Sequence, residues 1–169
     1  EEEGKRSMGG RKGDGEEMEQ DVEEAVKRYR QAANQGDADA QWSLGVMNKN
    51  GQGVMQDFKE AVKWFRQGAD QGGACAQWFL GLMYKNGEGV TQDSKEAVKW
   101  FRQAADQGNA NAQCSLGFMY NNGQGVAQDF KESLHWFRQA ANQDTAEAQC
   151  RLGLMYNCTF YTPDAADSS

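Results

Sequence analysis

The stretch DFKEAVKWFRQGADQG at residues 57–72 decides the fold of this chain of 169 residues. It returns 36 residues later as DSKEAVKWFRQAADQG at 93–108, and after the same interval as DFKESLHWFRQAANQD at 129–144. A more divergent copy, DVEEAVKRYRQAANQG, stands at 21–36. We call this unit the Trp-Phe segment. Its constant spacing indicates structurally equivalent repeats, and a period of this size is typical of solenoids.

A second unit, which we call the Leu-Gly segment, keeps the same period. Its copies are AQWSLGVMNKNGQG at 40–53, AQWFLGLMYKNGEG at 76–89, AQCSLGFMYNNGQG at 112–125 and AQCRLGLMYN at 148–157. Apolar residues recur at helical spacing in both units, as Ala61, Phe65 and Ala69 do. The sequence therefore predicts an all-α solenoid of helix hairpins, with about four 36-residue repeats.

Polar residues and glycines mark the ends of the expected helices. Aspartates that precede a glutamate by three residues predict N-caps at Asp21, Asp57, Asp93 and Asp129. Glycines that end the Trp-Phe segments predict left-handed C-terminal residues at Gly36, Gly72 and Gly108. The eight helices are expected near 21–35, 38–50, 57–71, 74–86, 93–107, 110–122, 129–143 and 146–158.

Three regions are predicted along the chain. Residues 1–20 form an acidic tail that is disordered or weakly helical near its end, residues 21–158 form the solenoid, and residues 159–169 form a short second tail. The repeat is abandoned after residue 158, so the last helix lacks its hairpin partner. Its outer face is exposed unless Phe160 and Tyr161 fold back on it or another molecule covers it.

Small and aromatic residues at equivalent positions predict the packing. Glycine in mid-helix costs about 1 kcal/mol relative to alanine, so its recurrence predicts close helix contact. These glycines are Gly45, Gly81, Gly117 and Gly153. Trp64, Trp100 and Trp136 are predicted in the core between repeats, whereas Arg28 replaces them at a solvent-facing end of the stack.

Charge and composition argue against several classes of function. The net charge of −7 does not suit a nucleic-acid partner, and no apolar run is long enough to insert into a membrane. The chain begins at Glu1 without a secretory signal, and its natural N-terminus can lie further upstream, because the first residue is not a methionine. His135, the one histidine, is expected at the surface, so neither a metal site, a cofactor nor a catalytic triad is predicted.

The two repeated segments resemble the Sel-one-like repeat (SLR) family over residues 21–158. This resemblance implies a right-handed superhelix of antiparallel helix pairs with a concave groove. Family members serve mostly as adaptors and scaffolds, and some act in host interaction or toxin immunity. In related stacks the Leu-Gly helix lines the groove, which implies a partner-binding set of Trp42, Trp78, Cys114, Cys150, Val46, Leu82, Phe118, Lys49, Lys85, Asn86, Asn121 and Asn122.

The spacing of the four cysteines indicates whether disulfides form, and therefore whether the protein is in an oxidising or a reducing cellular compartment. Cys114 and Cys150 occupy successive repeats at an expected separation of about 8–10 Å, and Cys150 and Cys158 lie roughly 12 Å apart along one helix. A disulfide needs Cα atoms within about 7 Å, so neither pair is expected to bridge. Unpaired cysteines favour a reducing, cytoplasmic location. The cysteine-rich members of the family pair residues eight apart, but here Asp106 precedes Cys114 at that spacing.

The predicted function is a non-catalytic protein–protein interaction module, an adaptor or scaffold that binds a protein or peptide segment in the concave groove. An inhibitor or immunity protein for a single toxin or enzyme is an alternative with the same fold. A hydrolase-like enzyme is the weakest alternative, and a spacer within a longer chain is another. Trp42 and Trp78 also have a purely structural interpretation, in which they pack between neighbouring helices.

Overall fold

The computed structural model describes the backbone of residues 13–143 and the side chains of residues 21–143. This part of the chain is all-helical. Its elements are α1 (Gly13–Asn34), α2 (Ala38–Asn50), α3 (Phe58–Asp70), α4 (Ala74–Asn86), α5 (Ser94–Asp106), α6 (Ala110–Asn122) and α7 (Phe130–Ala141). The predicted helix at 146–158 and the proposed fold-back of Phe160 and Tyr161 lie outside the described residues.

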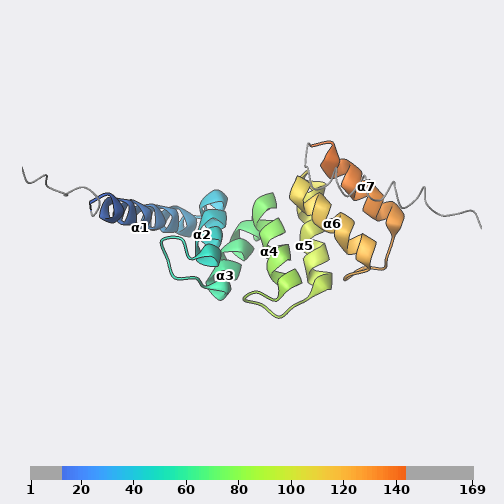
Figure 1. The fold of residues 1–169 in the computed structure, drawn as a ribbon, viewed down its shortest axis with the longest axis horizontal. Helices are drawn as coiled ribbons and strands as arrows, with labels where there is room; N and C mark the ends of the chain where they lie inside the picture. Colours follow the sequence, from blue (N-terminus) through green and yellow to red (C-terminus); the bar gives the residue numbers. More distant parts are fainter. Residues whose placement is uncertain (1–12, 144–169) are drawn as a thin grey trace, which may run out of the picture.

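The helices follow one another in chain order along the long axis of the molecule (Figure 1). Each packs against the helix before it and the helix after it, and the pairs α2–α3, α4–α5 and α6–α7 share the most extensive contacts. We call α2, α4 and α6 the Leu-Gly helices, and α3, α5 and α7 the Trp-Phe helices. This nearest-neighbour packing is that of a solenoid, as the repeats predict.

Side-chain caps begin the Trp-Phe helices as predicted. The carboxylate of Asp57 accepts a hydrogen bond from Glu60 N at 3.0 Å, and Asp93 and Asp129 cap α5 and α7 in the same way. The prediction for Asp21 is wrong, because this residue lies inside α1, which begins at Gly13. The five residues directly before Asp21, Glu16–Gln20, are good helix formers, whereas a Val-x-Gln sequence precedes Asp57, Asp93 and Asp129, so the helix runs through Asp21.

Glycines end the helices and shape the turns between them. Gly36, Gly72 and Gly108 have positive φ angles of 93°, 88° and 87°, as predicted. The turn glycine Gly125 also has a positive φ, of 69°, and its Cα approaches the backbone of Ser94 so closely that no side chain would fit. The turn of one repeat therefore rests on the start of the preceding Trp-Phe helix.

The mid-helix glycines of the Leu-Gly helices face the phenylalanines of the helices that follow. A Cβ added to Gly81 would lie 2.6 Å from the ring of Phe101, and one added to Gly117 would lie 2.8 Å from the ring of Phe137. Gly45 meets Phe65 in the same manner. Phe65 and Phe101 are fully buried, so each ring occupies the space that a side chain would need.

Buried glutamines connect each Leu-Gly helix to both of its neighbours. Gln77 of α4 is 4% exposed and donates a hydrogen bond to the carbonyl oxygen of Ala69 on α3, at 3.2 Å. Its side-chain oxygen accepts from Gln107, which ends α5, at 2.7 Å. Gln41 and Gln113 form equivalent pairs with Gln71 and Gln143. The sequence alone does not indicate this ladder of glutamine pairs, because a polar residue inside a helix is usually exposed.

Replacement of Gly81 by leucine tests the contact with Phe101. We expect a loss of about 3 kcal/mol or more in the free energy of unfolding, because the ring must leave a fully packed site. The gain in helix propensity, about 1 kcal/mol, does not offset this loss. Thermal unfolding followed by circular dichroism measures the effect, and Cys75→Leu at an exposed position of α4 is the control. An unchanged melting temperature would contradict the close contact.

Candidate functional site

The two tryptophans of the predicted binding set lie between neighbouring Leu-Gly helices and are only partly buried. The ring of Trp42 on α2 lies 6.3 Å from that of Phe79 on α4, and Phe79 stacks on Phe65 at 5.0 Å. Trp78 donates a hydrogen bond from Nε1 to Ser115 Oγ on α6, at 3.1 Å. Both tryptophans therefore take part in packing while keeping some surface in contact with solvent.

A second row of apolar side chains lies one helical turn further along the same helices. Val46, Leu82 and Phe118 occupy equivalent positions on α2, α4 and α6, and each is partly exposed. The ring of Phe118 meets that of Phe137 edge to face at 5.4 Å, which holds its orientation. This row presents apolar surface at regular intervals.

Polar residues continue the Leu-Gly helices beyond this row. Lys49 and Lys85 are partly exposed, as is Asn121 at the equivalent position of α6, while Asn86 and Asn122 are exposed. Within residues 21–143 neither lysine forms an ion pair. Both ammonium groups are thus available to an acidic group from outside.

The structure removes Cys114 from the predicted surface. Its side chain is 5% exposed and packs with Ala140 of α7, so it belongs to the interior. A thiol is small enough to pack between α6 and α7, whereas the larger indoles of Trp42 and Trp78 stay partly exposed at the equivalent positions of α2 and α4. Cys75 is an exposed free thiol on α4. Cys150 lies outside the described residues.

The tryptophans of the Trp-Phe helices pack between repeats, as predicted. Trp64 joins Val26, Ala33, Ala40 and Leu44 of the preceding helices in one cluster and is 8% exposed. Trp136 is equally buried, whereas Trp100 keeps more exposure. The indole N–H groups of Trp100 and Trp136 are buried without a hydrogen-bond partner among the described residues.

The outer faces of the Trp-Phe helices carry solvated charges. Lys63 donates a hydrogen bond to Glu60 at 2.7 Å, and this bond together with the carboxylate charge raises the pKa of Lys63. Glu96 raises the pKa of Lys99 in the same way. His135 is exposed, as predicted. These pairs lie in water, where ion pairs stabilise a fold only weakly.

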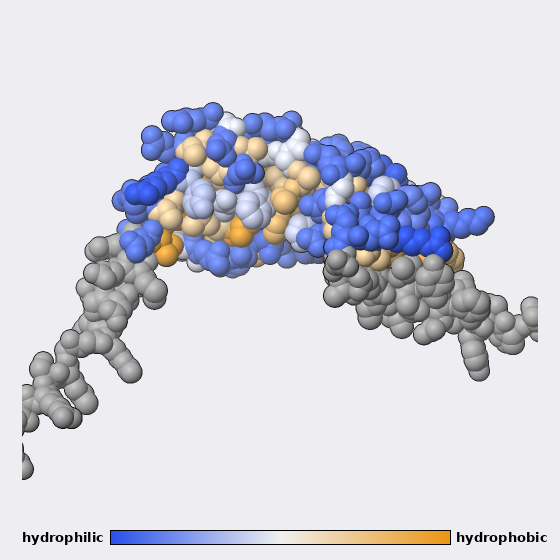
Figure 2. Space-filling model, turned by 90° about the horizontal axis from the view of Figure 1, so that it is seen from above, coloured by the Kyte–Doolittle hydropathy of each residue, from blue (hydrophilic) through white to orange (hydrophobic). Residues whose placement is uncertain are grey.

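The described residues offer neither a metal site nor a membrane-spanning helix. No cluster of three or more histidine, cysteine or acidic side chains within them could hold a metal ion. None of their helices combines the length and the apolar character needed to cross a bilayer. Figure 2 shows apolar surface gathered near the middle of one face of the row, with hydrophilic side chains around it.

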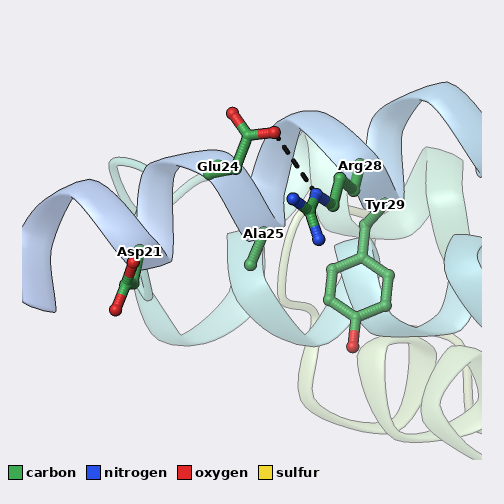
Figure 3. A pocket seen from close by; sticks show the side chains of 5 residues that line it. All are labelled: Asp21, Glu24, Ala25, Arg28 and Tyr29. Atoms are coloured by element: carbon green, nitrogen blue, oxygen red, sulfur yellow. Dashed lines mark hydrogen bonds and ion pairs between the residues drawn. The ribbon is translucent and has the colours of Figure 1, made fainter.

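A shallow pocket lies on α1, at the first helix of the row. Its lining consists of Asp21, Glu24, Ala25, Arg28 and Tyr29 (Figure 3). Arg28 pairs with Glu24 at 3.3 Å across its rim, and the Arg28 side chain is 79% exposed, in agreement with its expected place at an end of the stack. No sequence motif indicates this pocket, although Ala25, Arg28 and Tyr29 are equivalent to Ala61, Trp64 and Phe65, which are buried in α3.

The chain matches the Sel1 repeat family over nearly its whole length. The family model described as Sel1 repeat matches residues 7–37, 38–73, 76–109, 110–145 and 146–158. No curated protein matches the chain.

Three solved structures have the same arrangement of helices. The protective antigen c5321 of uropathogenic Escherichia coli, which has an SLR fold, superposes with a TM-score of 0.79 at 40% identity over 82% of this chain and 30% of that protein. A Sel1 repeat protein from Oxalobacter formigenes gives 0.76 at 35% identity, over 80% of this chain and 54% of the other. This chain thus spans only part of either protein.

The third structure, cysteine rich protein B of Helicobacter pylori, supports the fold alone. Its TM-score is 0.63 at 21% identity, over 79% of this chain and 96% of that protein.

The unequal burial of equivalent tryptophans provides a test of the packing. We expect Trp64→Ala to lower the free energy of unfolding by about 3–5 kcal/mol, as a buried aromatic truncation does. Trp100→Ala should cost clearly less, because Trp100 is more exposed and its indole N–H is unsatisfied. Urea unfolding of the two variants measures the difference, and equal losses would contradict the unequal burial.

Proposed function

Because the chain belongs to the Sel1 repeat family, we propose that it binds a protein partner along the Leu-Gly helices and catalyses no reaction. Members of this family are generally helical repeat modules that bind other proteins. The observation that carries the proposal is the row of partly exposed apolar side chains on α2, α4 and α6, beside two lysines without ion pairs.

The apolar row has the properties of a binding anchor. Trp78 is held by its hydrogen bond to Ser115, and Phe118 is held by the ring of Phe137. Side chains that are already ordered lose little conformational entropy on binding, so their exposed area contributes more fully to affinity. Aromatic residues also dominate the binding energy of known interfaces. The concave groove implied by the family fold would bring these anchors onto one surface.

The polar residues define the chemistry of the expected partner. Lys49 and Lys85 would attract carboxylates, and the amides of Asn86, Asn121 and Asn122 can both donate and accept hydrogen bonds along a peptide backbone. The proposed ligand is therefore a peptide segment that carries acidic residues next to apolar ones. Cys114 has no part in this proposal, because it is buried.

Charge reversal on the Leu-Gly helices tests the proposed face. After affinity purification has identified a partner, we expect the double variant Lys49→Glu/Lys85→Glu to bind it at least about tenfold more weakly, which corresponds to about 1.4 kcal/mol. Titration calorimetry measures the affinity. Added salt should weaken the wild-type complex and reduce the difference between the two proteins.

The matched control is Lys59→Glu/Lys95→Glu, which makes the same change in charge at exposed positions of α3 and α5. This control should bind as the wild type does, and circular dichroism should show both variants folded. Equal affinity of the two double variants would place the partner on a different face.

A further inference from the structure

Position 79 departs from the pattern of the other Leu-Gly helices. The equivalent residues of α2 and α6 are Ser43 and Ser115, whereas α4 carries Phe79. Ser115 accepts a hydrogen bond from Trp78 Nε1, at 3.1 Å. The residue that stands in this relation to Trp42 is Phe79, which offers no acceptor, and the Trp42 Nε1–H group is buried without a partner among the described residues. Phe79 therefore costs the fold one buried hydrogen bond.

Phe79 brings three partly exposed rings together, and we call Trp42, Phe79 and Trp78 the aromatic cluster. The Phe79 ring lies 6.3 Å from that of Trp42 and 4.8 Å from that of Trp78. It also stacks on the fully buried ring of Phe65, with 5.0 Å between the ring centres and 9° between the ring planes. Between α4 and α6 a serine and a cysteine occupy the equivalent positions, so no such cluster forms there. The aromatic cluster is therefore an ordered surface that belongs to α2 and α4.

Two positive charges lie on the same faces of α2 and α4 as the aromatic cluster. Lys49 and Lys85 follow Trp42 and Trp78 by two helical turns, or about 10 Å along each axis. Both lysines are partly exposed, and neither forms an ion pair among the described residues. The exposed Asp39 lies one turn before Trp42, so the positive charge is confined to one end of the surface. A ligand of this surface therefore needs an apolar part and an acidic part, a short distance from each other.

Among the ways in which proteins bind peptides, recognition of a polyproline II segment suits this surface best. The part of the chain that the structure describes has no strand whose edge could accept a peptide strand. A helical ligand already bonds its own backbone and makes no use of the exposed amides of Asn86 and Asn122. A polyproline II segment has no internal hydrogen bonds, so its carbonyl groups are free to accept from such amides. Proline-rich segments also pack into grooves that aromatic side chains line.

We propose that the segment bound along the Leu-Gly helices is proline-rich and acidic, with its prolines packed on the aromatic cluster and its carboxylates paired with Lys49 and Lys85. This inference rests on the proposed function and names the class of segment that is bound. Polyproline II advances about 3.1 Å per residue, so about three residues cover the distance between the cluster and the lysines. Three residues also make one turn, which places a proline and the acidic residue on the same face of the segment.

Three synthetic peptides test the class of ligand. One consists of three copies of Pro-Pro-Pro-Glu, the second has glycine in place of every proline, and the third has lysine in place of every glutamate. Titration into isotope-labelled protein, followed by nuclear magnetic resonance of the indole N–H groups, measures their affinities. We expect the first peptide to bind at least about tenfold more tightly than either of the others. It should shift the signals of Trp42 and Trp78, but not that of the buried Trp64.

Substitution of Phe79 tests the aromatic cluster. Phe79→Leu keeps an apolar side chain but removes the ring, and Phe79→Ser gives α4 the serine of the other repeats. Both variants should bind the acidic proline peptide at least about tenfold more weakly than the wild type does. Phe130→Ser, at a position of α7 that is 58% exposed, is the matched control and should bind as the wild type does. Circular dichroism checks that each variant is folded, and Phe79→Leu provides the test if Phe79→Ser is not.

Several outcomes would overturn the inference. They are equal affinity for the acidic proline peptide and either of the other two, no binding of it up to about 1 mM, and undiminished binding by folded Phe79→Leu. Failure of the proposed function gives a different result, namely a natural partner that binds Lys49→Glu/Lys85→Glu as it binds the wild type. A natural partner that depends on both lysines but contains no proline-rich segment overturns the present inference alone.

Discussion

The contact between a bare glycine and a buried phenylalanine ring sets the geometry of the three hairpins α2–α3, α4–α5 and α6–α7. Gly81 and Phe101 approach so closely that not even a Cβ fits between helix and ring. Glycine weakens an isolated helix, so α4 depends on its neighbours for stability. The same dependence holds at Gly45 and Gly117, and it couples each Leu-Gly helix to the Trp-Phe helix that follows it.

Hydrogen bonds add direction to this apolar contact. Gln77 donates to the preceding Trp-Phe helix and accepts from the end of the following one, so a single buried amide aligns three helices. Apolar packing alone permits sliding, whereas a buried amide loses its partners when the register shifts. The ladder therefore explains how weakly stable units stack with a constant offset, and why stability is shared between neighbouring repeats.

The regular part of the fold could be predicted from the sequence, because every local signal is repeated. The observed bounds of α2, α4 and α6 coincide with the expected 38–50, 74–86 and 110–122. Asp21 shows the limit of a local rule, since a capping pattern starts a helix only where the preceding chain leaves helical geometry. Cys114 shows a second limit. Periodicity identifies equivalent positions, but the size of each side chain decides how far it is buried.

Differences between repeats, rather than their similarities, locate the surfaces that can distinguish partners. Residues that hold the hairpins α2–α3, α4–α5 and α6–α7 together recur unchanged, as Phe65, Phe101 and Phe137 do, because each ring packs against a mid-helix glycine. One position of the Leu-Gly helices is Lys49 in α2, Lys85 in α4 and Asn121 in α6, although the backbone of the three helices is equivalent. At this position the side chain is not buried in any of the three helices, so its identity can vary without disturbing the packing. The chemistry of the exposed face can therefore change along the row without any loss of the fold that presents it.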